Sequence, residues 1–260
     1  MSDDVVLHGG VNTVVRRGDV IHRPAAAHTP TVHRLLSHLR ARGFNGAPAP
    51  LGFDAEGREL VTFVAGEVHD ALTPALRTPE LVASAGRLLR QLHDASADFE
   101  HTADDVWMLP AQVPGEVICH GDVAPYNSVV RDGRVVGFID FDTAHPGPRL
   151  WDVAYAVYRF APLHAPGNPD HAGDLADQAA MAAVFCGAYG VVPSGALIDT
   201  VVARLRALIA YLRQQAAAGN AAFASHIADG HIALYEADID YLRARRDAMG
   251  RVWASRSGRS

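Results

Sequence analysis

The sequence predicts an α+β protein of two lobes, a small antiparallel N-terminal lobe and a larger, mainly helical C-terminal lobe. The first 64 residues hold five short runs rich in β-branched and aromatic residues, with one helical pattern among them. From about residue 79 onward, apolar residues recur at helical spacing instead. Because Ala65-Gly66-Glu67 lies between the two patterns, we expect residues 1–66 and 67–260 to form separate lobes.

The N-terminal pattern predicts five strands and one helix. Three short strands within residues 5–23 are separated by turns at Gly9-Gly10 and Gly18-Asp19. A helix begins near Thr29, where a proline follows, because proline is favoured in the first helical turn. That helix ends at Gly43, and two further strands are predicted at 49–53 and 60–64.

Helices dominate the prediction for the rest of the chain. They are expected at residues 79–93, 153–161, 172–190, 195–217 and 221–248. Between the first two lies the segment 118–152, whose short apolar runs predict buried strands. An Asp132-Gly133 turn within this segment predicts a hairpin.

Composition excludes several classes of protein. The formal charge of −6 argues against general binding to nucleic acid or to anionic membranes. No run approaches the roughly 20 apolar residues of a membrane span, and the acidic N-terminus does not resemble a signal peptide, so we expect a cytoplasmic protein. Cys119 and Cys186 are too few for a disulfide framework and are expected to be buried as small apolar residues. The composition does not indicate an oligomeric state.

All 23 basic residues are arginines, so the chain contains no lysine. This excludes a Walker-A phosphate-binding loop, whose lysine contacts the phosphates. It also excludes catalysis through a lysine Schiff base.

The segment 118–152 contains three acids and one amide in an order suited to phosphoryl transfer. Asp122 and Asn127 lie five residues apart in a loop, Asp140 follows a predicted strand, and Asp152 opens a predicted helix. Phosphoryl transfer needs positioning, metal ions and a base near the acceptor hydroxyl. Carboxylate and amide oxygens are the ligands that Mg²⁺ prefers. The predicted hairpin brings Asn127 and Asp140 together, so we expect Asp122 to orient the acceptor hydroxyl beside a magnesium site.

These residues resemble a known family. His-Gly-Asp at 120–122 with Asn127, followed by Ile-Asp-Phe-Asp at 139–142 and by Asp152, is similar to the signature of the aminoglycoside phosphotransferase and choline-kinase-like family. The resemblance extends over the whole chain and implies a bilobal protein-kinase-like fold. It implies Mg²⁺-dependent transfer of the γ-phosphoryl group of ATP or GTP to a hydroxyl group of a small molecule. Amino sugars, aminoglycosides and amino alcohols are all possible acceptors.

The resemblance also implies roles for individual residues. Asp122 would be the base, with His120 and Asp152 bracing its loop within the catalytic group. Asn127 and Asp140 would bind Mg²⁺. Asp142 is either a further metal ligand or a solvated acid, and both alternatives stay open.

The N-terminal lobe would bind the nucleotide, but it departs from the family pattern. Gly9, Gly10 and Asn12 are expected at the nucleotide, where glycines allow close backbone approach. Arg23 occupies the place of the usual phosphate-binding lysine, and arginine can hold phosphate with two donors; a solvated arginine is the alternative. The following helix contains no glutamate to pair with it. That ion pair is therefore either missing or replaced from elsewhere.

The sequence also allows other interpretations besides a phosphotransferase. A non-catalytic or weakly active nucleotide- or ligand-binding protein, such as a toxin-immunity protein, could have the same fold. A protein kinase is disfavoured because HRD, DFG and APE segments are absent, and the histidine spacings do not predict a zinc site. Five helical acids are expected to be solvated rather than to bind substrate amines. They are Asp174, Asp177, Glu236, Asp238 and Asp240.

Overall fold

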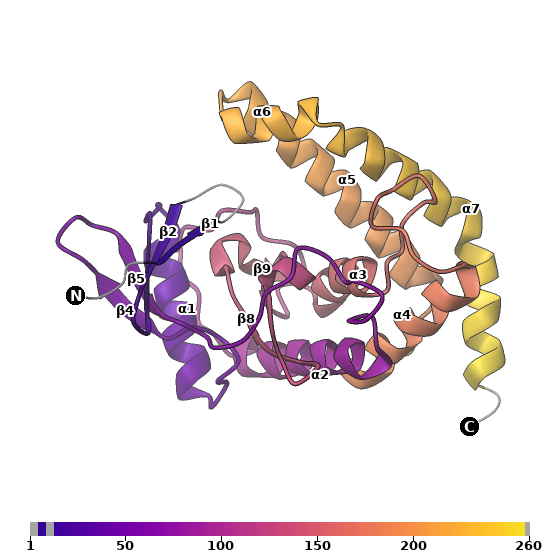
Figure 1. Cartoon of the computed structure of the whole chain (residues 1–260), viewed down its shortest axis with the longest axis horizontal. Coiled ribbons are helices and arrows are strands. Elements are labelled where there is room, and N and C mark those ends of the chain that lie inside the picture. The colour runs from indigo at the N-terminus through magenta and orange to yellow at the C-terminus, as the bar shows by residue number, and fades with distance from the viewer. Residues whose placement is uncertain (1–4, 9–12, 258–260) are drawn as a thin grey trace.

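The computed structural model describes residues 5–8 and 13–257, which form two lobes (Figure 1). The strands are β1 (Val5–His8), β2 (Thr13–Arg17), β3 (Val20–Arg23), β4 (Pro50–Phe53), β5 (Glu59–Thr62), β6 (Val117–Cys119), β7 (Ser128–Arg131), β8 (Arg134–Phe138) and β9 (His145–Gly147). The helices are α1 (Thr29–Ala41), α2 (Pro79–Ser96), α3 (Arg149–Phe160), α4 (Leu175–Tyr189), α5 (Gly195–Ala217), α6 (Ala221–Ala228) and α7 (His231–Ser257). Two short 3₁₀ helices are η1 (Pro125–Asn127) and η2 (Phe141–Thr143). This arrangement confirms the predicted α+β fold class.

The N-terminal lobe is a five-stranded antiparallel sheet with one helix. The strand order is β1-β2-β3-β5-β4, and every neighbouring pair is antiparallel. Helix α1 lies against this sheet (Figure 1) and buries the apolar stripe visible in the sequence. The five strands and the helix were all predicted, with ends that differ by one or two residues.

The chain leaves this lobe through a close backbone crossing at Gly66. Its φ is +147°, and a Cβ at this position would lie 2.7 Å from the carbonyl oxygen of Val130. The next residue, Glu67, exchanges two backbone hydrogen bonds with Val130, of 2.9 and 2.7 Å. The glycine is required because any side chain would push the crossing segment away from β7. The division of the chain into domains 1–66 and 67–260 stays a prediction.

The C-terminal lobe is mainly helical. Helices α2, α3 and α4 pack on one another and contribute to a buried apolar cluster that also takes in residues of α1, α5 and α7. Helices α5 and α7 form a long pair with α6 at its far end (Figure 1). The helix predicted at 221–248 was wrong as a single element. It is two helices, because the chain turns at Asp229-Gly230, where Gly230 has φ +87°. Gly at such a position ends a helix in the left-handed conformation.

Two small antiparallel strand pairs pack against the helices, with β8 on α2 and β6 on α2 and α3. The β7–β8 hairpin turns at Asp132 and Gly133, with φ of +51° and +70°. A positive φ at both central residues is typical of a tight two-residue hairpin turn. The second pair joins β6 to β9, whose sequence His-Pro-Gly gave no strand signal. Strand β9 forms through backbone pairing with β6 and not through its own sequence preference.

The helical acids fall into two groups, and the prediction for Asp238 was wrong. Asp238 is fully buried and accepts hydrogen bonds from Tyr158, His164, Asn168 and the backbone nitrogen of Ala165. The other four acids lie at the surface or near it. Asp174 and Asp177 form a capping box at α4, Glu236 pairs with Arg213, and Asp240 is exposed.

Both cysteines are buried and unpaired with each other, as predicted. Within residues 5–8 and 13–257, no helix has the length and apolar character needed to cross a membrane.

Candidate active site

A tight turn at Gly121 sets the loop that follows β6. Gly121 has φ +85°, and a Cβ there would lie 2.4 Å from the carbonyl oxygen of Thr143. The hydroxyl of Thr143 in turn donates to the carbonyl oxygen of His120 at 2.9 Å. Only glycine fits this turn, which explains the second residue of the His-Gly-Asp motif.

The carboxylate of Asp122 accepts two hydrogen bonds within its own loop. Its Oδ1 accepts from the hydroxyl of Tyr126 at 2.8 Å, and its Oδ2 accepts from Asn127 Nδ2 at 2.9 Å. Asn127 Nδ2 also donates to the backbone oxygen of Asp122 at 3.0 Å. These bonds fix the side chain of Asn127 and leave its Oδ1 as the oxygen available to a metal ion.

The hairpin brings Asp140 beside Asn127, as predicted. The backbone nitrogen of Ile139 donates to the carbonyl oxygen of Asn127 at 2.9 Å, so Asp140 follows directly. Asp140 itself has φ +63° and ψ +66°, the left-handed region that a non-glycine residue seldom adopts. Such conformations persist where the surroundings impose them, and they gather at functional sites.

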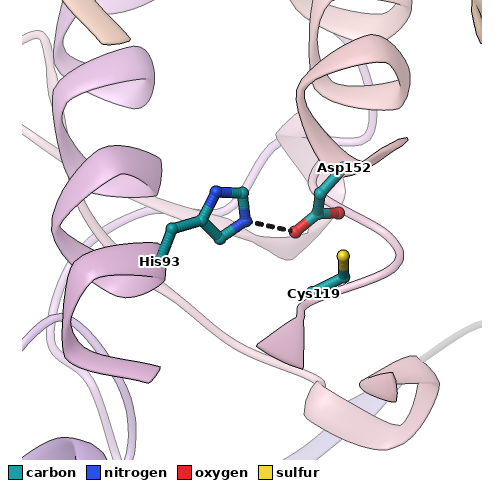
Figure 2. A group of neighbouring side chains, drawn as sticks. All are labelled: His93, Cys119 and Asp152. Carbon is teal, nitrogen blue, oxygen red and sulfur yellow. Dashed lines mark hydrogen bonds and ion pairs between the residues drawn. The ribbon is translucent and has the colours of Figure 1, made fainter. Parts of the chain in front are cut away.

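Asp152, in the first turn of α3, anchors the His-Gly-Asp loop. Its Oδ2 accepts from His93 Nε2 at 3.0 Å (Figure 2) and from the backbone nitrogen of His120 at 2.7 Å. Its Oδ1 accepts from the backbone nitrogen of Gly121 at 3.0 Å. Burial alone would raise the pKa of this carboxyl, but the hydrogen bonds and charges of these partners lower the pKa of Asp152 to about 2. The carboxylate therefore stays ionised and holds both backbone amides in place.

His120 is a positioning residue in this geometry. Its ring is fully buried, and Nε2 lies 3.0 Å from the carbonyl oxygen of Ile139. Its Nδ1 accepts from the backbone nitrogen of Asp122 at 3.3 Å, which assigns the ring proton to Nε2. His120 thus links the Asp122 loop to the strand that leads to Asp140.

His93, from α2, completes this support and was not predicted as a site residue. Because its Nε2 donates to Asp152, its Nδ1 accepts from the hydroxyl of Tyr189 at 2.7 Å. The available signal was a histidine at the end of the apolar stripe of α2, which the sequence does not distinguish from an ordinary helix end.

His93, Cys119 and Asp152 lie close enough together to suggest a metal site (Figure 2). Their hydrogen bonds argue otherwise, because both oxygens of Asp152 and both nitrogens of His93 already have partners. Burial raises the pKa of the Cys119 thiol well above its usual value, so the thiolate that a metal needs is disfavoured. The group is a structural anchor.

Arg23, at the end of β3, connects the two lobes at the site. Its guanidinium pairs with Glu59 and Asp142 and donates to Asp140 Oδ1 at 2.8 Å. The side chain is 13% exposed, so the alternative of a solvated arginine is wrong. Arg23 instead lies directly beside two of the predicted metal ligands.

Glu59 supplies the carboxylate that α1 lacks. It comes from β5, is 1% exposed, and contacts both Arg23 and His33 Nε2, the latter at 2.9 Å. Antiparallel pairing sets Glu59 directly opposite Arg23 in the sheet. The ion pair expected from the family pattern is therefore replaced by one between neighbouring strands.

The two acids beside Arg23 have opposite pKa shifts. Burial would raise the pKa of Asp142, but a hydrogen bond from His28 and the charge of Arg23 outweigh it and lower that pKa. Withdrawal from solvent and the neighbouring Asp142 charge raise the pKa of Asp140, although its side chain is half exposed. Asp142 is thus an ionised acid in an ion-pair cluster, which excludes the solvated alternative.

The residues present suit a magnesium ion. Asn127 Oδ1 and the carboxylates of Asp140 and Asp142 are hard oxygen donors, few enough to leave positions for phosphate oxygens and water. A cation, the guanidinium of Arg23, already lies against both carboxylates. The site therefore accommodates positive charge, and these three residues would hold the ion.

A sequence model of the phosphotransferase enzyme family matches residues 2–106 and 103–184, which is more than half of the chain. The chain belongs to that family. The predicted resemblance is thereby confirmed, and the matched region contains the His-Gly-Asp loop, the Asp140 segment and Asp152.

The relatives and structural neighbours of this chain have names that describe different activities. The chain is 39% identical over 172 residues to the trifolitoxin immunity protein of Rhizobium leguminosarum bv. trifolii, a match that covers 63% of this chain and 64% of that protein. It spans less than two thirds of the length of that relative. A choline/ethanolamine kinase family protein from Mesorhizobium loti has the same fold, with a TM-score of 0.61 at 19% identity over 95% of this chain and 93% of that one. An amicoumacin kinase solved with AMP-PNP and Ca²⁺ also scores 0.61, at 13% identity over 87% and 88% of the two chains.

The structure brings most of the predicted site residues together. They are His120, Asp122, Asn127, Asp140, Asp142, Asp152 and Arg23. Gly9, Gly10 and Asn12, predicted to approach the nucleotide, lie outside the described residues. Two supporting residues, His93 and Glu59, were missed.

Replacing Glu59 with glutamine is expected to raise the dissociation constant for Mg-nucleotide about tenfold, within the range of one hydrogen bond to a charged group. Glutamine keeps the volume of Glu59 but has no charge with which to hold Arg23. The guanidinium should then remain on Asp140 and Asp142 and be less available to phosphate. Isothermal titration with a non-hydrolysable nucleotide checks this. Glu56→Gln, on the exposed turn three residues earlier, is the matched control. An unchanged constant in folded Glu59→Gln protein contradicts the role.

Proposed function

We propose that this chain transfers the γ-phosphoryl group of ATP or GTP, with Mg²⁺, to a hydroxyl group of a small molecule. The observation that carries the proposal is the convergence of Asp122, Asn127 and Asp140 with Arg23 at one place between the lobes. These are a carboxylate for the acceptor hydroxyl, oxygen ligands for a cation, and a guanidinium for phosphate. Magnesium, when bound, would neutralise charge on the phosphates.

Asp122 can serve the acceptor without leaving its present position. Its Oδ1 holds the Tyr126 hydroxyl, and a carboxylate oxygen has a second lone pair for another donor. An acceptor hydroxyl bonded there would face the phosphate with its proton directed at Asp122. Because Asn127 holds the other oxygen, the carboxylate keeps its orientation as the acceptor enters.

Arg23 can serve the nucleotide while it stays paired with Glu59. A guanidinium has five N–H donors, and the three acids beside Arg23 occupy three of them. A metal ion at Asp140 and Asp142 would take over the neutralisation that Arg23 now provides. The freed donors of Arg23 would then point at phosphate oxygens, while Glu59 holds the side chain in place.

Replacing Asp140 with alanine is expected to remove the stabilisation that Mg-nucleotide gives the native protein. Ligand binding to the folded state raises stability by about 2.7 kcal/mol at 100 times the dissociation constant, and the variant should lose most of this. Thermal unfolding with and without millimolar Mg-ATP or Mg-GTP measures the effect. Asp247→Ala, on an exposed face of α7, is the control. A native protein that neither nucleotide stabilises contradicts the proposal.

The second candidate is a nucleotide- or ligand-binding protein with weak or no turnover, acting in toxin immunity. The 39% identity to an immunity protein favours it. The two candidates differ in one measurement, the release or transfer of γ-phosphate by protein that binds Mg-nucleotide. Binding without either reaction, across a broad acceptor panel, supports the second.

A further inference from the structure

A small cavity of about 70 Å³ adjoins the loop that carries Asp122 and Asn127. Its walls come from the segment 71–77, the end of α3 and the loop 162–171, and Pro125 of η1 closes it on the side of that loop. The volume holds about two water molecules at roughly 30 Å³ each, or one small ion.

Two arginines line this cavity, and both have a buried nitrogen without a partner. One terminal N–H group of Arg159 donates a hydrogen bond to Asp170 Oδ2 at 3.1 Å. One terminal N–H group of Arg77 donates to the carbonyl oxygen of Leu72 at 2.8 Å. Among the described residues, Nε of each has no hydrogen-bond partner although it is shielded from solvent. Buried guanidinium donors normally find acceptors. No oxygen atom of the described residues accepts a hydrogen bond from Nε of Arg77 or Nε of Arg159.

The charge in the cavity is positive. Asp170 pairs with Arg159, while Arg77 has no ion pair within the described part of the chain. A larger recess of about 740 Å³ beside α1 differs, because its arginines Arg34 and Arg42 pair with Asp105 and Asp98. The small cavity is therefore suited to an anion and would repel an ammonium group.

Arg159 also connects the cavity to the proposed base. Its guanidinium carbon lies 5.4 Å from the centre of the Tyr126 ring, whose hydroxyl donates to Asp122. On the far side of the same loop, Arg204 is buried and donates to the carbonyl oxygen of Gly121 at 2.6 Å. Two arginines thus lie beside the loop that carries Asp122, where a site for polycationic acceptors would need acids.

We propose that Arg77 and Arg159 form a binding site for an oxyanion, a carboxylate or phosphate group, that belongs to the acceptor. The assignment to the acceptor rests on the proposed function, whereas the anion site stands on the cavity and its unpartnered donors. The hydroxyl of such an acceptor would lie at Asp122 and its acidic group between the two guanidinium groups. The same chemistry would admit a free inorganic anion, so the test separates the two sources.

The first arm measures binding of inorganic phosphate by titration calorimetry and thermal unfolding at constant ionic strength, without nucleotide. Arg77→Gln is expected to raise the dissociation constant at least about tenfold, as for loss of a charged hydrogen bond. Arg87→Gln, a matched exposed arginine on α2, should change it less than about twofold. Arg159→Lys keeps the charge and tests the site if Arg77→Gln does not fold. Binding that survives in Arg77→Gln but is lost in Arg23→Gln overturns the proposal.

The second arm compares three acceptors that differ only in their terminal group, which is a carboxylate, a hydroxyl or an amine: glycerate, glycerol and 3-aminopropane-1,2-diol. Greater phosphate incorporation into glycerate, reduced by Arg77→Gln but not by Arg87→Gln, supports the acceptor assignment. Phosphate binding at Arg77 with no preference for glycerate makes the ligand a free anion and overturns that assignment. If none of the three compounds is phosphorylated, the assignment to the acceptor fails, while the first arm still decides the anion site and the broad acceptor panel decides the proposed function.

Discussion

Asp122→Asn is expected to lower the rate of phosphoryl transfer by about 10²- to 10⁴-fold, the usual contribution of a general base. The amide can still accept from Asn127 through its oxygen and can bond Tyr126 through its nitrogen, so the loop should keep its shape. What it cannot do is take the proton of the acceptor hydroxyl. Nucleotide affinity should change less than about twofold, because no contact to the Arg23 cluster is removed.

Single-turnover assays of Asp122→Asn with an acceptor found by screening would measure this loss, and calorimetry would measure nucleotide affinity. The control is Tyr126→Phe, which removes the neighbouring hydroxyl but keeps the carboxylate. A normal rate in Asp122→Asn would exclude Asp122 as the base. A joint loss of nucleotide affinity would show instead that the loop had collapsed.

Asp152→Ala is expected to destabilise the protein by about 3–5 kcal/mol, the effect of breaking a buried, hydrogen-bonded charge pair. The alanine leaves two backbone amides and His93 without their acceptor in the interior. Urea unfolding measures the loss. Asp94→Ala, a half-exposed acid on α2 that also pairs with arginines, should cost less than about 1 kcal/mol. Equal effects of the two substitutions would contradict the anchoring role.

The same carboxylate has a pH signature. Because the pKa of Asp152 is lowered from 3.8 to about 2 on folding, its stabilisation is complete above pH 3.8. It is lost as the pH falls through about 2. The shift corresponds to about 2 kcal/mol, so the difference in unfolding free energy between native protein and Asp152→Asn should shrink between these pH values.

The positions of the catalytic-loop residues could be predicted because each depends on local chemistry. The left-handed turn at residue 121 requires glycine, and the Asp132-Gly133 turn fixes the hairpin register. Asp140 then lies two residues beyond Phe138, where β8 ends. Such features depend on neighbours in the sequence. The sequence therefore sufficed to bring Asn127 and Asp140 together.

Features that depend on distant partners were missed. Glu59 meets Arg23 only because β5 pairs with β3, and sequence alone offers no sign of that strand order. His93 meets Asp152 across two packed helices, and Asp238 is buried because a loop 70 or more residues away folds over it. An acidic residue on a helix is exposed by default, and only tertiary structure reverses that expectation.

The position of Arg23 has a kinetic consequence. It belongs to β3 in the N-terminal lobe, whereas Asp140 and Asp142 belong to the C-terminal lobe, so one side chain joins the two lobes at the proposed nucleotide site. Under the proposed function, entry of the nucleotide would require the ion pairs of Arg23 with Asp140 and Asp142 to open first. Salt weakens ion pairs between partly exposed groups, so added salt should speed the opening step even as it weakens the attraction of Arg23 for phosphate.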